Sequence, residues 1–138
     1  MKNDYQDSEV IEKIIENSKI IAVVGLSDKP ERPSYGVARY LQSKGFKIIP
    51  VNPSIKNVLG EISYPDLNSI PGKVDLVDIF RKSEDVGPIV DAAIAKKADS
   101  IWMQEGVVNE EAALKAKTGG LDVVMDLCIL KEHSRRKR

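Results

Sequence analysis

The sequence contains few of the residues that build catalytic or metal centres. It has one cysteine, Cys128, and one histidine, His133, among 138 residues. A single cysteine excludes an intrachain disulfide, which fits the reducing environment of the cytoplasm. The two residues are five positions apart and so would not share a face of a helix, and no group of residues has the spacing of a metal site. We therefore expect no catalytic residue, no metal centre, and a Cys128 that packs as a small apolar side chain.

Long apolar runs and an excess of one charge are also missing. No run approaches the length needed to span a bilayer, and the polar N-terminus lacks the apolar region of a signal peptide. Lysine plus arginine equals aspartate plus glutamate, 21 against 21, so no broad basic field favours nucleic acid. The basic residues Lys131 and 135–138 are typical of a solvated end. We expect a cytoplasmic protein without nucleic-acid or membrane partners; the sequence leaves open a homodimer or a partner protein.

The chain is organised around residues 20–36. Residues 20–24 form a continuous apolar run rich in β-branched side chains, which is typical of a strand buried on both faces of a parallel sheet. Gly25 ends this run, a polar loop follows, and Ser34 offers a helix N-cap before residues 35–44. A strand, a glycine turn and a helix N-terminus in this order form the opening unit of nucleotide-binding α/β domains. The loop amides and the helix dipole there attract phosphate.

Strand and helix patterns alternate along the rest of the chain. This alternation predicts an α/β, Rossmann-like three-layer fold, with a parallel sheet of about five strands in the order 3-2-1-4-5 and helices on both faces. The chain length fits one domain, residues 1–138. We expect residues 1–6 to be a loose end and residues 127–138 to form a short, fraying helix. The further strands are expected at residues 46–51, 74–80, 100–103 and 121–125, with a short edge strand at 62–64.

The loop after the first strand departs from the dinucleotide-binding pattern. The motif G-x-G-x-x-G needs three glycines within six residues, whereas the next glycine after Gly25 is Gly36. The second strand also ends without the acid that binds a ribose hydroxyl of NAD, since Asn52 and Pro53 stand there. A ligand with an additional ribose phosphate fits this composition better. The candidates are NADP, as in an oxidoreductase or a redox-sensing domain, and coenzyme A; an interaction domain that binds neither is a third possibility.

Several short motifs occur in order along residues 23–133. They are V-V-G-L-S, R-P-S-Y-G-V, P-V-N-P, L-G-E with Y-P, D-I-F-R, W-M-Q-E-G-V and D-L-C-I-L-K-E-H. This ordered set resembles the small stand-alone CoA-binding proteins, whose fold is similar to the CoA-binding domain of the succinyl-CoA synthetase alpha subunit. One departure is Leu127, where the family pattern has an arginine before the cysteine, so no role of that arginine is carried over.

The resemblance implies a single domain that binds coenzyme A or an acyl-CoA and performs no chemistry of its own. Ligation in the synthetase relatives needs further domains. The implied binding residues fall into four groups along the ligand. The amides of Gly25, Leu26 and Ser27 would approach the pyrophosphate; Arg32, Ser34 and Tyr35 would close the loop over it; Asn52 and Pro53 would border the adenosine; and Phe80, Arg81 and Gln104 would line the path of the pantetheine arm.

Each of these assignments has a purely structural alternative. Gly25 could serve only as a tight turn, and Asn52 as a turn residue beside proline. Phe80 could belong to the core, and Arg81 could be a solvated charge at a helix start. Trp102 is interpreted as a packing residue rather than as a ligand contact.

Overall fold

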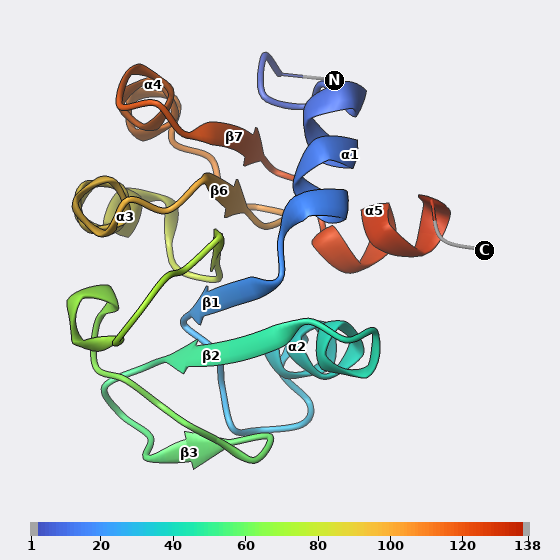
Figure 1. Cartoon of the computed structure of the whole chain (residues 1–138), viewed down its shortest axis with the longest axis vertical. Coiled ribbons are helices and arrows are strands. Elements are labelled where there is room, and N and C mark those ends of the chain that lie inside the picture. Colours follow the sequence, from blue (N-terminus) through green and yellow to red (C-terminus); the bar gives the residue numbers. More distant parts are fainter. Residues whose placement is uncertain (1–2, 137–138) are drawn as a thin grey trace.

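Residues 3–136 are described by the structure, a computed structural model, and they build a five-stranded parallel sheet between two layers of helices. The strand order is β2-β1-β5-β6-β7 (Figure 1). The main strands are β1 (Ile20–Val24), β2 (Lys47–Val51), β5 (Leu76–Ile79), β6 (Ser100–Met103) and β7 (Asp122–Met125), and a separate two-stranded ribbon consists of β3 (Asn57–Val58) and β4 (Glu61–Ile62).

Strand β1 lies between β2 and β5 in the sheet. It pairs in parallel with β2 on one side and with β5 on the other. Four of its five residues are buried, which agrees with a strand that is covered on both faces. Because all pairs in this sheet are parallel, every strand ends at the same edge, here called the carboxyl edge; the opposite one is the amino edge.

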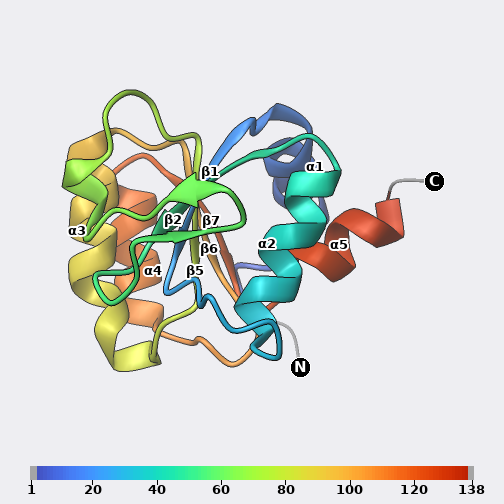
Figure 2. The ribbon, with the colours of Figure 1, turned by 90° about the horizontal axis from the view of Figure 1, so that it is seen from below.

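The helices cover both faces of the sheet. Helices α1, α2 and α5 lie on one side, and α3 and α4 lie on the other (Figure 2). Each side has its own apolar core, and successive residues of β1 alternate between them: Ile21 and Val23 belong to the first core, Ala22 and Val24 to the second. The helices are α1 (Ser8–Asn17), α2 (Pro33–Ser43), α3 (Val86–Lys96), α4 (Glu110–Thr118) and α5 (Ile129–Arg136), with short 3₁₀ turns η1 (Leu67–Ser69) and η2 (Ser83–Asp85).

The fold class predicted from the sequence is confirmed, and the strand order is matched approximately. The third main strand, β5, lies beside β1 opposite β2, so the five strands run 2-1-3-4-5. The expected edge strand at residues 62–64 contributes one parallel bridge, from Tyr64 to Val51. That bridge lies on the outer side of β2, which is the position the order 3-2-1-4-5 gives to its third strand.

The N-termini of α1 and α2 are capped differently, and the cap expected at Ser34 is displaced by two residues. Helix α1 is capped by Asp7, whose side chain accepts from the amides of Glu9 and Val10. Helix α2 begins at Pro33, so its N-cap position falls on Arg32, which makes no side-chain cap bond. Proline fits the first helical position because its fixed φ suits a helix and no N–H is needed there. Ser34 therefore lies in the first turn of α2 and does not occupy the N-cap position.

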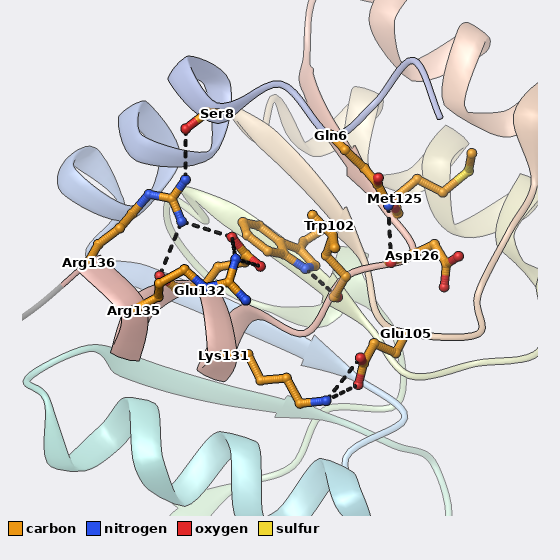
Figure 3. Close-up of polar contacts among 11 residues, drawn as sticks. Gln6, Ser8, Trp102, Glu105, Met125, Asp126, Lys131, Glu132, Arg135 and Arg136 are labelled. Carbon is orange, nitrogen blue, oxygen red and sulfur yellow. Dashed lines mark hydrogen bonds and ion pairs between the residues drawn. The ribbon is translucent and has the colours of Figure 1, made fainter. Parts of the chain in front are cut away.

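The expectation of a loose N-terminal end is wrong for residues 3–6. The amide of Met125 donates to the Tyr5 carbonyl at 3.0 Å, and the Asn3 side chain donates to the Met125 carbonyl at 3.1 Å. The Gln6 amide adds bonds to the carbonyls of Met125 and Asp126 (Figure 3). This segment therefore covers the end of β7. Residues 1–2, and residues 137–138 of the expected basic end, lie outside the described part.

Candidate functional site

Two cavities open at the carboxyl edge, one on each face of the sheet. The α3-side cavity, of about 420 Å³, is lined by residues that include Gly25, Pro53 and Arg81. The α2-side cavity, of about 470 Å³, is lined by residues that include Phe80, Arg81 and Gln104. Arg81 belongs to both linings. A ligand with two chemically different ends could therefore use both faces of the sheet and cross its edge at this arginine.

Gly25 brings β1 into close contact with the end of β5. Its φ is +89°, and a Cβ placed on it would lie 2.5 Å from the Phe80 carbonyl oxygen. Its amide donates to the Val51 carbonyl at 2.9 Å. The glycine is thus needed for the turn and for the packing of three strand ends, so the tight-turn interpretation describes a real part of its role. A residue with a side chain at this position would push the Arg81 segment away.

The loop between β1 and α2 is held by its own polar groups. The Ser27 amide donates to Ser34 Oγ at 3.0 Å, and Ser27 Oγ accepts from the Lys29 amide at 3.0 Å. Of the three amides that the sequence assigned to a pyrophosphate, those of Gly25 and Ser27 are therefore engaged. The amide of Leu26 has no backbone partner among residues 3–136. The whole residue, backbone included, is 0% exposed, so the Leu26 amide is shielded from a ligand in this conformation.

Asn52 fixes the neighbouring loop to this one. Its Nδ2 donates to the Leu26 carbonyl at 2.9 Å, and its Oδ1 accepts from the Ser54 amide at 2.9 Å. Both ends of the side chain amide are therefore occupied by backbone. This is the turn role that the sequence left open, and it leaves Pro53 as the residue of this pair that lines a cavity.

Two arginines lie near the edge in different settings. Arg81 is half-exposed and pairs loosely with Asp85 at 3.7 Å. Arg32 is exposed, and within residues 3–136 it has no ion pair and no side-chain hydrogen bond. Its position directly before α2 places it beside the positive end of that helix dipole. Neither guanidinium is committed to a strong internal partner, so both remain available to an anionic group.

The α2-side cavity combines apolar walls with a buried amide and a thiol. Its lining includes Val37, Phe80, Val107, Gln104 and Cys128. Gln104 is 4% exposed, and its Oε1 accepts from the Ile129 amide at 3.2 Å. Cys128 is buried, as the sequence predicted.

The segment that carries Cys128 is fixed by contacts at both ends. The indole nitrogen of Trp102 donates to the Leu127 carbonyl at 2.9 Å, and Lys131 pairs with Glu105 at 3.0 Å (Figure 3). Trp102 is fully buried, which confirms its interpretation as a packing residue. These contacts join the start of α5 to the end of β6.

Helix α5 is docked rather than solvated. Buried Glu132 accepts from Arg135 and Arg136, and Arg136 also donates to Ser8 Oγ (Figure 3). Buried His133 shares a 2.7 Å hydrogen bond with the Tyr40 hydroxyl. Of the described basic residues in this stretch, Lys131 and Arg135 are exposed, as a solvated end requires, whereas Arg136 is docked. The helix connects α1 and α2 through Arg136 and His133.

Asp78 is the one buried carboxyl group in the middle of the described sheet. It is fully buried on β5, and neither oxygen has a hydrogen-bond partner among residues 3–136. Burial without a partner disfavours the charged form and raises the pKa of Asp78 well above 3.8. Asp78 pairs in register with Trp102 and lies two residues before Phe80, so it is on the same sheet face, beneath the α2-side cavity.

Five of the residues assigned from the sequence line the two cavities, and six lie in the adjoining loops or at the start of α2. The lining residues are Gly25, Pro53, Phe80, Arg81 and Gln104; the others are Leu26, Ser27, Arg32, Ser34, Tyr35 and Asn52. The sequence reasoning missed Cys128 and Val107 as lining residues. The rule that ligands bind at strand ends would have found Cys128, because it follows β7 as Gln104 follows β6.

Comparisons with known proteins identify the family of the chain. Residues 19–134 match the sequence profile of a family described as a CoA binding domain. The chain is 44% identical over 124 residues to the uncharacterized protein YneT of Bacillus subtilis, which covers 90% of this chain and 92% of that protein. The solved structure of a hypothetical protein from Pyrococcus horikoshii OT3 has a TM-score of 0.91 and 38% identity, with 98% of both chains covered.

A more distant relative is an enzyme subunit. The alpha subunit of the ADP-forming acetate–CoA ligase II of Pyrococcus furiosus is 39% identical over 64 residues, which is 46% of this chain and 14% of that subunit. The similarity thus concerns a small part of the ligase subunit. Within residues 3–136, no helix combines the length and the apolar character needed to cross a membrane.

Proposed function

The chain belongs to the CoA-binding domain family, and we propose that it binds coenzyme A or an acyl-CoA at the carboxyl edge of its sheet. The observation that supports this most is the pair of cavities that share Arg81. Coenzyme A has a nucleotide end with three phosphates and a long, mostly uncharged arm. A site with a hollow on each face of the sheet and a cation between them suits such a molecule.

We propose that the phosphates lie beside the loop between β1 and α2. The N-terminus of α2 and the uncommitted guanidiniums of Arg32 and Arg81 provide donors or positive charges at this place. The amides of Gly25 and Ser27 would then shape the loop instead of contacting the ligand. Ser34 and Asn52 would keep that shape through their hydrogen bonds to Ser27 and Leu26.

The nucleotide end would lie in the α3-side cavity and the pantetheine arm in the α2-side cavity. Pro53 offers an apolar surface for an adenosine, while Phe80 and Gln104 offer one wall and one amide for the arm. Asn52 stands where a NAD site has an acid, and its side chain is occupied by backbone. This disfavours NAD and leaves NADP as the alternative nucleotide.

Thermal denaturation with three nucleotides tests the proposal. A ligand that binds only the folded state stabilises it by mass action, by about 2.7 kcal/mol at a hundredfold excess over Kd. At equal concentrations, coenzyme A should raise the melting temperature more than NAD or NADP does. A shift with NAD that equals or exceeds the shift with coenzyme A would contradict the proposal, and a larger shift with NADP would favour the alternative.

A further inference from the structure

The α2-side cavity contains the thiol of Cys128, and we propose that this thiol exchanges with a disulfide of coenzyme A and so fixes the ligand covalently in the site. The inference rests on the proposed function, because it uses the pantetheine arm to bring a sulfur into this cavity. It concerns one stoichiometric step and requires no turnover.

Access to the thiol is restricted to the cavity. Cys128 is 8% exposed and lines the hollow together with the apolar side chains of Val37, Phe80 and Val107. A disulfide reagent must therefore enter the cavity before it can react. This restriction predicts that a reagent that also binds the nucleotide part of the site reacts faster than one that does not.

Gln104 provides an independent sign that a polar ligand group belongs in the same cavity. It lines the hollow and is 4% exposed. Its Oε1 accepts from the Ile129 amide, which identifies the other amide atom as the Nε2 donor. That Nε2 has no hydrogen bond within residues 3–136. Within residues 3–136 only the Asp78 oxygens are both fully shielded and unpartnered, so Gln104 Nε2 is reached by the solvent of the cavity, where a carbonyl of a pantetheine arm would supply an acceptor.

The same contact holds this donor close to the thiol. Ile129, whose amide donates to Gln104, follows Cys128 directly, and the Trp102 indole fixes the preceding Leu127 carbonyl. The amide donor and the sulfur therefore belong to one rigid unit at the end of β6 and β7. A ligand whose carbonyl is bound by Gln104 would have the following part of its arm placed beside Cys128.

The surroundings of Cys128 include a helix N-terminus and a nearby ammonium group. The Cys128 carbonyl accepts from the Glu132 amide at 3.0 Å, which places the thiol at the N-cap of α5, where the helix dipole stabilises negative charge. The pKa of exposed Lys131 is raised first by its hydrogen bond to Glu105 and by the charge of Glu105, and in smaller part by Cys128. The ammonium therefore lies within electrostatic reach of the sulfur. The thiolate is the form that attacks disulfides.

The exchange is balanced without an additional oxidant. The Cys128 thiol loses its proton to solvent, and its sulfur attacks one sulfur of the coenzyme A disulfide. A bond forms between Cys128 Sγ and one coenzyme A sulfur, and the original disulfide bond breaks. The second coenzyme A leaves as a thiolate and takes up a proton. Cys128 and the bound coenzyme A are now joined, and one equivalent of thiol is released.

Intact-mass spectrometry on the reduced full chain tests the exchange. We expect one coenzyme A adduct, formed at least roughly tenfold faster than the adduct with glutathione disulfide at equal concentration, because binding makes the attack effectively intramolecular. Excess acetyl-CoA, whose thioester sulfur cannot exchange, should slow the coenzyme A adduct only. Dithiothreitol should reverse it. Because the chain has one cysteine, Cys128→Ser should give no adduct.

Two glutamine variants distinguish an effect within the α2-side cavity from a general effect on the fold. Gln104→Met keeps the side chain length but removes the donor, and should slow the coenzyme A adduct about threefold to tenfold. Gln42→Met is the matched control, since Gln42 on α2 donates to the Leu59 carbonyl and does not line the cavity. It should leave the rate unchanged. Protection by acetyl-CoA in the native chain needs no variant and keeps the test valid if Gln104→Met unfolds.

Equal rates with both disulfides and no protection by acetyl-CoA would overturn the inference. Calorimetry with coenzyme A under reducing conditions distinguishes the two proposals. If coenzyme A binds there but its disulfide gives no adduct, the exchange is excluded and the proposed function stands. If coenzyme A does not bind, the proposed function fails, and this inference fails with it.

Discussion

Polar groups at the two edges of the parallel sheet differ in how they are paired. At the amino edge these groups satisfy one another: the Asp75 carboxylate accepts from the amides of Lys19 and Ile20, both at 2.9 Å. At the carboxyl edge, Gln104 Nε2 and the Arg32 guanidinium have no partner among residues 3–136. Both donors lie at the edge where parallel sheets bind ligands.

The presence of a cavity does not by itself distinguish the carboxyl edge from the amino edge. The amino edge also has a cavity, of about 340 Å³, with Lys13, Asp99 and Asp122 in its lining. The charges there are paired internally: Lys13 with Asp122 and Lys73 with Asp99, each at 3.0 Å. A charged ligand would have to break these pairs. The uncommitted donors, and not the number of charges or the cavity volume, therefore support the proposal that the ligand binds at the carboxyl edge.

Two glycines, one at each edge, give the largest expected difference. Gly25 has a φ of +89° and would place a Cβ 2.5 Å from the Phe80 carbonyl, whereas Gly45 at the amino edge has a φ of +96° but open space around it. Gly25→Ala should therefore combine backbone strain with a steric clash and lower the free energy of unfolding by at least about 3 kcal/mol. Gly45→Ala should cost about 1 kcal/mol, from strain alone.

Urea denaturation followed by circular dichroism measures both values. A third variant, Gly36→Ala, controls for the added methyl group, since Gly36 lies inside α2 with no atom near the new Cβ. It should stabilise the protein by roughly 0.5–1 kcal/mol. If Gly25→Ala costs no more than Gly45→Ala, the close approach of β1 to β5 is not a tight packing contact, and the proposed shape of the phosphate loop is wrong.

Asp78 lies in the protein interior and differs from Asp75 at the amino edge in its hydrogen bonding. Asp75, three residues earlier, has two amide partners at the amino edge, but Asp78 has none within the described residues, and burial raises its pKa. The folded state therefore binds the Asp78 proton more tightly than the unfolded state does. The stability that this proton provides is complete below the unfolded value near 3.8 and decreases as the pH rises toward the folded value.

Between these two pH values the native protein should lose about 1.4 kcal/mol of stability per pH unit relative to Asp78→Asn, which cannot ionise. Denaturation in urea at several pH values between about 4 and 7 measures this difference. Gly45→Ala, which changes no titratable group, should keep a constant offset from the native protein over the same range. A constant offset for Asp78→Asn as well would show that Asp78 has a charge partner or solvent contact in the folded state.

The fold could be predicted to a large extent because its signals are local. The apolar run at residues 20–24 and the glycine after it specify a buried strand and its turn without reference to the rest of the chain. The position of β5 beside β1, by contrast, depends on how the long segment between β2 and β5 packs. Only the single bridge from Tyr64 to Val51 takes the edge place that the predicted order assigned to a strand.

The candidate site was predicted less completely, for a related reason. Strand ends are visible in the sequence, so residues such as Arg81 and Gln104 could be assigned by position. Whether an amide or a side chain is free depends on long-range partners. Ser34 was predicted to cap α2, but its hydroxyl accepts from the Ser27 amide instead. Cys128 was predicted to be buried, which is confirmed, but its place in a cavity lining depends on the packing of α5 against β6.

A change at Arg32 is expected to have the smallest effect on stability. It also tests directly whether a phosphate binds at the carboxyl edge. Its side chain is exposed and unpaired within the described residues, so Arg32→Ala should hardly change the melting temperature of the ligand-free protein. If the guanidinium binds a phosphate, the loss of charge-assisted hydrogen bonds, about 1.5–3 kcal/mol each, should weaken coenzyme A binding roughly tenfold or more. Arg32→Lys should recover only part of the affinity, because an ammonium lacks the planar fork of donors.

Titration calorimetry on matched arginine variants decides whether this edge effect is specific. Arg39→Ala is the control: Arg39 is exposed on the same helix α2 and has no ion pair within residues 3–136. It removes the same net charge, so a general electrostatic effect would weaken binding equally in both variants and would shrink with added salt. A loss confined to Arg32→Ala would assign the phosphate contact to Arg32. Unchanged affinity in Arg32→Ala would leave the phosphates to Arg81 and the N-terminus of α2.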